Sequence, residues 1–414
     1  FERAESFAGG DPARTVRISN ERALLEVRDQ GPGYLERALA TAEAAAPHGG
    51  LAELRAQSTL GAALLYSGSP EWEPVLRSAL AKIAAVGEPE LESATAFHLV
   101  SGLGLHGRLR EAIEVAGVQV DRARVAGLGS WVTHLEQVWF THRGVTSAGL
   151  QTMIADAEAH LATHQLGGAR NHVHFGRTLA ELDLGRFDDA RHSLAQMVAE
   201  STGAPDETAM IATVRSELAW FVDDLEMAAY ALEEGRSSDG AYFGLQTLVE
   251  RTVAYVFVRH GEPFEPRYPS FTMPMWWSAI HEIQGLVALA AGDTRTAADE
   301  LRCAFEHASA VGIPRWIARV GIVASDAGAD LRSEAIDTAR RAGLVGVLRR
   351  LGISTRPELT FTEESVLRRI AAGETSRQAA TALGIAPGTV DQHVESARRK
   401  LGAATRFEAA VLVT

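Results

Sequence analysis

The stretch "SAIHEIQGLVALAAGDTRTAADELRCAFEHASAVG" (residues 278–312) predicts two helices joined by one tight turn. On each side of Gly292, apolar residues recur at intervals of three and four, which is the period of a helix with one buried face. Gly292 suits the turn because a residue without a Cβ can adopt the left-handed conformation that ends a helix. The second helix would then fold back on the first, with Ala297 as the small residue that permits a close approach.

The same pattern recurs along the chain. It is found in "GRLREA", "GRFDDA", "GYLERA" and "DDLEMA", which begin at Gly107, Gly185, Gly33 and Asp223. Weaker members begin at Gly68, Gly261 and Gly328. Many of the intervals are close to about 38 residues, enough for two helices and two turns. One such hairpin cannot bury its apolar stripe alone, so neighbouring hairpins must stack into a superhelix. We therefore predict an all-α fold, with tetratricopeptide-like repeats over residues 21–352 and an N-terminal connection over residues 1–20.

Composition limits the classes of partner. The chain has 414 residues and a formal net charge of −13, which argues against indiscriminate binding to nucleic acids or acidic membranes, so any basic surface must be local. Cys303 is the only cysteine, which excludes an intrachain disulfide and a cysteine-based metal cluster and fits a reducing cytoplasm. The opening "FERAESFAGG" has neither a basic region nor a long apolar run, so we expect no secretory signal and no membrane span.

The last residues form a separate unit. Pro357 bars a helix from continuing through residues 353–358, which we take as a linker before a domain at 359–414. Capping boxes at "TFTE" (360–363), "TSRQ" (375–378) and "TRFE" (405–408) predict the starts of three helices, and Pro387 suits the start of a fourth. The predicted helices are 361–372, 376–383, 387–401 and 406–413. The second and third, joined by a short turn that contains glycine, make a helix-turn-helix. Its predicted core is Val366, Leu367, Ile370, Ala380, Leu383, Ile385, Val390, Val394, Ala397 and Leu401.

This C-terminal stretch, "LTFTEESVLRRIAAGETSRQAATALGIAPGTVDQHVESARRKLGAATRFEAA", resembles the LuxR-type DNA-binding domain of bacterial transcription regulators. The resemblance rests on residues in the family's order and spacing: Leu359, Thr360, Glu363, Val366, Leu367, Gly373, Ala380, Leu383, Ile385, Thr389, Val390, His393, Lys400, Leu401, Gly402, Arg406 and Ala409. With helical repeats before it, the chain is similar to the C-terminal part of MalT-like or LAL-type regulators. Those carry an ATPase module, whereas neither Lys82 nor Lys400 lies in a P-loop here. Either the chain is the C-terminal part of such a regulator or the module was never there.

The resemblance implies that helix 387–401 enters the major groove of double-stranded DNA, with the protein bound as a homodimer. The base-facing positions of the family are occupied here by Asp391, Gln392 and Glu395. Phe407, Val411 and Leu412 are a dimer contact in this interpretation, unless their helix packs on its own domain. The predicted DNA-binding residues are Thr375, Ser376, Arg377, Thr389, Asp391, Gln392, Glu395, Arg398, Arg399, Lys400 and Arg406.

Two acids on a surface meant for DNA need an explanation. An acid early in a helix stabilises it by about 0.3–1 kcal/mol through the helix dipole, and a Glu395–Arg399 pair adds about 0.2–0.5 kcal/mol. Both contributions stabilise the helix only and do not favour DNA binding. Phosphates repel carboxylates, whereas a well-placed acid can accept a hydrogen bond from cytosine. From Pro357 onward the chain has seven basic and seven acidic residues, so the domain is neutral. Either the helix reads an operator selectively, or it is degenerate and the repeats act as a protein-interaction scaffold.

Other motifs have ordinary explanations beside functional ones. His160 and His164, one helical turn apart, suit zinc, but no third ligand is evident and surface or packing histidines are favoured. The segment 273–282, with Met273, Met275, Trp276 and Trp277, marks either core packing or a partner surface. We find no catalytic constellation and expect no enzyme, cofactor or metal, unless an upstream ATPase exists. The repeats are expected to bind a small-molecule or protein effector.

Overall fold

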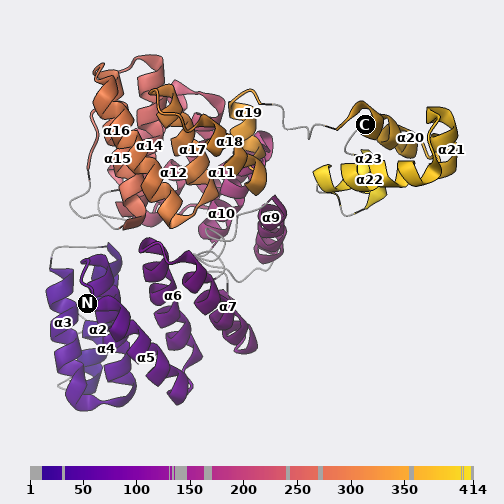
Figure 1. Cartoon of the computed structure of the whole chain (residues 1–414). Coiled ribbons are helices and arrows are strands. Elements are labelled where there is room, and N and C mark those ends of the chain that lie inside the picture. Colours follow the sequence, from indigo (N-terminus) through magenta and orange to yellow (C-terminus); the bar gives the residue numbers. More distant parts are fainter. Residues whose placement is uncertain are drawn as a thin grey trace. The chain divides into compact units, whose positions relative to one another are not determined.

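The computed structural model describes residues 12–29, 33–129, 131–132, 135, 147–162, 170–238, 243–268, 274–353, 359–401, 403 and 405–411. Over these residues the chain forms helices, turns and irregular segments, and no strand. It divides into two compact units, Phe1–Arg350 and Leu351–Thr414, which we call the repeat unit and the C-terminal unit (Figure 1). The predicted all-α fold is confirmed.

The repeat unit consists of helices that pack on their neighbours in the chain. The hairpins pair α4 (Gly50–Tyr66) with α5 (Trp72–Val86), α6 (Pro89–Leu105) with α7 (Leu109–Val125), α10 (Arg170–Asp183) with α11 (Phe187–Glu200), α12 (Pro205–Val222) with α13 (Leu225–Ser237), α15 (Pro274–Ala290) with α16 (Thr294–Val311), and α17 (Pro314–Asp326) with α18 (Arg332–Ala342). The other helices are α2 (Pro12–Asp29), α3 (Tyr34–Ala45), the short η1 (Ala46–His48), α9 (Ser147–Ala162), α14 (Phe243–His260) and α19 (Val345–Arg350).

The turns of these hairpins are built as the sequence predicts. Gly107, Gly185 and Gly292 have φ between 72° and 81°, in the left-handed region. Asp223, which replaces glycine in "DDLEMA", takes the same conformation with φ 60°. Among the residues that the structure describes, it is the one non-glycine residue with positive φ. Aspartate tolerates this region better than most side chains because its short polar group can bond locally.

The alanines after the turns are buried, as predicted. Their exposed fractions are 1% for Ala38 and 0% for Ala112, Ala190, Ala228 and Ala297. Helices α15 and α16 approach so closely that a Cβ on Gly285 would lie 2.6 Å from Cγ of Leu301. Small residues therefore set the distance between paired helices. The helical hairpins are present, while their assignment as tetratricopeptide-like repeats stays a prediction.

The structure differs from the sequence interpretation at two places. Helix α2 begins at Pro12 and packs on α3 and α4, so it takes in part of the stretch that we assigned to a connection. Gly261 ends α14, but residues 262–268 have no regular structure. Proline at 263 and 266 opposes a second helix there. That position therefore lacks the second half of a hairpin within the described part of the chain.

The aromatic segment near α15 divides between core and surface. Trp276 is 8% exposed and packs against Trp316, with ring centroids 6.0 Å apart. Trp277 is 41% exposed and lies edge-on to the ring of His307. Core packing, one of the two explanations, thus holds for Trp276. Met273, His164 and the side chains of Met275 and His160 lie outside the described residues.

Among the charged side chains buried in the repeat unit, four pair with one another, and we call these four the buried ionic cluster. They are Glu217 on α12, Arg251 on α14, Glu282 on α15 and Arg319 on α17, and each is at most 2% exposed. The guanidinium of Arg319 donates to both glutamates, at 3.1 Å each, and Arg251 donates to Glu217 at 3.2 Å. Burial, followed by the nearby Arg319 charge, lowers the pKa of Arg251 to about 10. Two arginines and two glutamates from four helices thus pair with one another inside the repeat unit.

The C-terminal unit contains α20 (Phe361–Ala371), α21 (Ser376–Leu383), α22 (Pro387–Leu401) and α23 (Arg406–Val411), shown in yellow in Figure 1. The starts of these helices match the predicted ones, and α20 ends one residue early. Seven predicted core residues are buried: Val366, Leu367, Ile370, Ala380, Val390, Val394 and Ala397. Leu383, Ile385 and Leu401 are partly buried against them.

Candidate nucleic-acid interface

Local hydrogen bonds fix the ends of the helix-turn-helix. At the start of α21, the Thr375 hydroxyl accepts from the Gln378 backbone while the Gln378 side chain accepts from the Thr375 backbone, which is the predicted capping box. Gly384, with φ 66°, ends α21, and Pro387 begins α22. The equivalent box at Thr360 and Glu363 is also present. The third predicted box depends on the Glu408 side chain, which lies outside the described residues.

One side of α22 is buried and the other is polar and open. Val390, Val394 and Ala397 face the core, whereas Asp391, Gln392 and Glu395 are exposed. The spacing of these three polar residues places them on one face of the helix. The structure therefore brings together the predicted base-reading residues on a surface that a groove could contact.

Asp391 is held in place by a residue of the neighbouring helix. The Ser376 hydroxyl at the start of α21 donates to Oδ1 of Asp391 at 2.8 Å. Arg406 on α23 donates in turn to Ser376 through Nη1, at 3.3 Å. Three predicted DNA-binding residues from three helices are thus linked. A carboxylate that already accepts one hydrogen bond is oriented, and it keeps acceptor capacity for a base.

Glu395 has a different partner from the one that we expected. It accepts two hydrogen bonds from Arg398, at 2.9 Å from Nε and 2.7 Å from Nη2, instead of pairing with Arg399. Arg398 also donates to the Ala403 carbonyl at 3.0 Å, just beyond the helix. The Arg398 guanidinium thus connects Glu395 with the residue beyond the helix end. The Arg398 hydrogen bond lowers the pKa of Glu395, so the carboxylate is ionised where DNA would approach.

Lys400 is exposed but pairs with a buried acid of its own domain. Its Nζ donates to Oε2 of Glu363 at 2.7 Å, and the Ser396 hydroxyl donates to the other carboxylate oxygen at 2.7 Å. Burial raises the pKa of Glu363, but the bonds from Lys400, Ser396 and Thr360 outweigh it and bring the pKa to about 2. Glu363 therefore serves as both helix cap and anchor of α22. Lys400 as a phosphate contact stays a prediction.

Two of the predicted cations remain open at the surface. Arg377 near the start of α21 and Arg399 near the end of α22 are exposed, and neither forms an ion pair within the described part of the chain. Thr375 is also exposed, and Thr389 is half-buried beside Val390. An arginine that forms no ion pair can bind a phosphate without breaking one. Arg377 and Arg399 are therefore the strongest phosphate-binding candidates.

Sequence reasoning missed Ser396 and the structural role of Lys400. The capping box identifies Glu363 as the residue that binds the Thr360 backbone, but it gives no sign of a second set of bonds to α22. Lys400 is 37 positions from Glu363. An interaction at that separation depends on how α20 and α22 pack, which no local pattern reveals.

The described residues hold no group of three or more histidine, cysteine, aspartate or glutamate side chains that could bind a metal. Within the same residues, no helix is both long enough and apolar enough to cross a membrane.

Comparison with known proteins identifies the C-terminal unit. Residues 357–413 match the family model "GerE: Bacterial regulatory proteins, luxR family". No curated protein is similar enough to the chain to count as a match. The C-terminal unit is therefore a LuxR-family helix-turn-helix domain, which marks the chain as a DNA-binding transcription regulator.

Proposed function

We propose that this regulator reads operator DNA with α22 of its LuxR-family domain and senses an effector or partner with its repeat unit. The observation that carries the proposal is the exposed face of α22, where Asp391, Gln392 and Glu395 lie on one side of the helix. Arg377, near the start of α21, and Arg399, near the end of α22, supply the phosphate contacts. Such a regulator acts in the cytoplasm, where the DNA is, and needs no enzymatic activity of its own.

The acidic face favours selectivity over affinity. Carboxylates accept hydrogen bonds from cytosine N4, and glutamine pairs with adenine, with about 1–3 kcal/mol of discrimination for a good bidentate contact. The same carboxylates repel the phosphate backbone of DNA of any sequence. We infer that binding to random DNA is weak and depends strongly on salt.

Binding as a homodimer would compensate for the weak affinity of a single domain for DNA. Phe407 on α23 is 66% exposed, although large apolar side chains gain free energy from burial. It supports a contact between two copies through α23. Of its predicted companions, Leu412 and the Val411 side chain lie outside the described residues.

The test is selection of duplexes from a random pool by the full chain, followed by binding curves with the enriched and a shuffled duplex. Measurements at about 50 and 200 mM salt separate the phosphate contribution from base reading. We expect an enriched sequence whose preference survives the higher salt. Replacing Gln392 and Glu395 by alanine should abolish the preference, while Glu364→Gln on α20 should not.

A second function has one observation in its favour. The seven acids and seven bases from Pro357 onward leave the domain neutral, as a repeat scaffold with a degenerate terminal domain would be. In that case the pool selection enriches no sequence at either salt concentration. That result would overturn DNA reading.

A further inference from the structure

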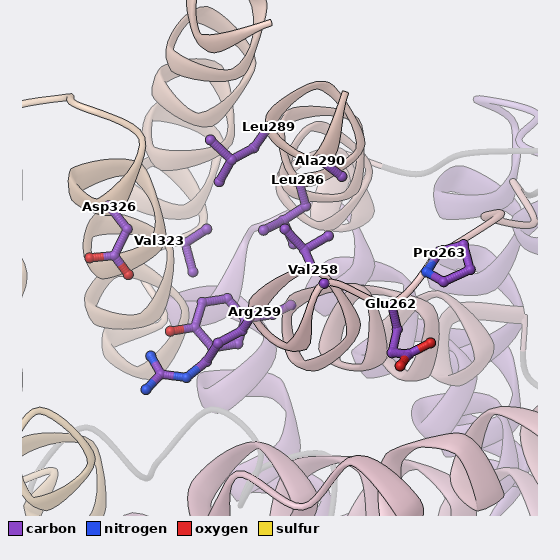
Figure 2. A pocket seen from close by; sticks show the side chains of 11 residues that line it. Val258, Arg259, Glu262, Pro263, Leu286, Leu289, Ala290, Val323 and Asp326 are labelled. Carbon is purple, nitrogen blue, oxygen red and sulfur yellow. The ribbon is translucent and has the colours of Figure 1, made fainter. Parts of the chain in front are cut away.

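The repeat unit contains an open pocket where a hairpin is incomplete. It lies between the end of α14, the irregular residues that follow, α15 and α17, and has a volume of about 560 Å³. Figure 2 shows Val258, Leu286, Leu289 and Val323 forming its apolar centre. Pockets for small ligands have volumes of about 300–1,000 Å³ and are mostly apolar with a few polar groups. The missing second helix after Gly261 leaves this site uncovered within the described residues.

The charged residues that line the pocket are two acids and one base. Asp326 and Glu262 lie on opposite sides of the apolar centre in Figure 2. Glu262 has no ion pair in the part of the chain that the structure describes. Asp326 forms a 3.8 Å pair with the exposed Arg332, and the charge of Arg259 also acts on it. The third charged lining residue, Arg259, already donates through Nε to Asp223 at 3.0 Å. The lining itself therefore has an excess of one negative charge.

The pocket is connected to the last residue of the repeat unit. Oδ2 of Asp223 binds Arg259, and Oδ1 of the same carboxylate accepts from Nη2 of Arg350 at 2.9 Å. The Arg350 guanidinium also lies 5.9 Å from the ring of Tyr255, which lines the pocket. Arg350 is the last residue before the chain passes into the C-terminal unit. One carboxylate thus holds a pocket residue and the end of the repeat unit together.

We propose that this pocket binds an amphipathic organic cation, an ammonium group on an apolar body, and that its occupancy is the signal sensed by the repeat unit. The sensing part rests on the proposed function, whereas the binding part does not. The ammonium meets Asp326 while the apolar body covers Leu286 and Leu289. A cation beside Arg259 repels its guanidinium, and Arg259 shares Asp223 with Arg350. Binding therefore changes the contacts that hold Arg350.

A matched set of probes tests the ligand class. We would titrate the full chain with 4-phenylbutylamine, 4-phenylbutanol and 4-phenylbutyrate, which share one apolar body and differ in charge, by calorimetry. A hydrogen bond to a charged group commonly changes affinity by about ten-fold or more. We expect the amine to bind about ten-fold tighter than the alcohol and the acid to bind weakest. Equal affinities, or a preference for the acid, would overturn the assignment of a cation.

Variants locate the binding. Asp326→Asn should remove most of the preference for the amine over the alcohol, whereas Glu262→Gln, on the other side of the apolar centre, should remove little of it. The matched control is Asp330→Asn, an exposed acid that does not line the pocket. Ala290→Trp places a large ring at an exposed rim position and should weaken all three probes. If the amine binds Ala290→Trp as tightly as it binds the unchanged chain, the pocket is not its site.

The sensing part has its own readout. The amine should change the affinity of the full chain for the duplex enriched by selection, and Asp326→Asn should abolish that change. Amine binding without any change in DNA affinity would overturn the sensing role and leave the binding site standing. Failure of the proposed function is distinct, because it appears as absence of selective DNA binding before any amine is added.

Discussion

Glutamate–arginine pairs occur in both units of this chain, in opposite settings. In the buried ionic cluster, Arg319 and its partners Glu217 and Glu282 have side chains at most 3% exposed. In the C-terminal unit, Glu395 and Arg398 are 52% and 32% exposed. Both arginines donate at hydrogen-bond distance. The difference in burial decides what each pair does.

A buried charge without a partner destabilises the fold by several kcal/mol, so each member of the buried ionic cluster holds the others in place. The pairs join α12 to α17, residues 102 positions apart in the chain. An exposed pair contributes little to stability because water screens it. Breaking the pair of Glu395 and Arg398 therefore costs little free energy, which is the property that the proposed DNA-reading surface requires.

The largest effect is expected from Arg319→Met. It removes one charge and leaves Glu217 and Glu282 buried, so we expect the repeat unit to lose about 3–5 kcal/mol of unfolding free energy. Urea denaturation followed by tryptophan fluorescence measures the loss. The control is Arg302→Met, whose pair with Asp299 is exposed at both ends and should change stability by less than about 1 kcal/mol. Equal losses in the two variants would break the distinction between buried and exposed pairs.

Glu363 should make the C-terminal unit sensitive to acid. Its folded pKa of about 2 lies below the ordinary 4.5, so its ionised form stabilises the fold above pH 4.5. That stability is lost as pH falls from about 4.5 toward about 2, and it amounts to about 3 kcal/mol. Thermal unfolding of the chain and of Glu363→Gln across this range measures it. The stability difference between the two should shrink as pH falls, and a constant difference would contradict the assignment.

Asp391→Lys should raise affinity for random duplex. Two unit charges in contact interact by about 1 kcal/mol in water, so replacing an acid by a base should give about ten-fold tighter binding at low salt. Fluorescence anisotropy with a labelled random duplex measures the change. Glu364→Lys on α20 makes the same change in charge away from α22 and should have a smaller effect. An unchanged isotherm for Asp391→Lys would remove Asp391 from the interface.

The smallest effect on stability is expected at Arg399. Arg399→Gln should reduce the dependence of log affinity on log salt by about 0.9 while changing unfolding free energy by less than about 0.5 kcal/mol. Lys400→Gln should instead destabilise the C-terminal unit by about 1–3 kcal/mol, because it removes the cation from Glu363. Salt titrations and unfolding curves of both variants make the comparison. If Arg399→Gln destabilises and Lys400→Gln does not, their roles are reversed.

Much of the fold could be predicted because its signals are local. Glycine or Asp223 at a left-handed turn, a hydroxyl followed three residues later by glutamate or glutamine, and proline at the start of α22 each act within one helical turn. The prediction was wrong for the partner of Glu395 because i,i+3 and i,i+4 pairs are both available on one helix. In the structure Arg398 takes the nearer position and also donates to the Ala403 carbonyl.

The sequence by itself determined the helical hairpins, the position of their turns and the LuxR-family helix-turn-helix with its exposed acids. Only the tertiary structure decided which charges meet. It joined Glu217 to Arg319, Glu363 to Lys400 and Asp223 to both Arg259 and Arg350. The reason is that helix starts and turns depend on neighbours in the chain, whereas the partner of a charge depends on helix packing, which brings residues tens of positions apart within hydrogen-bond distance.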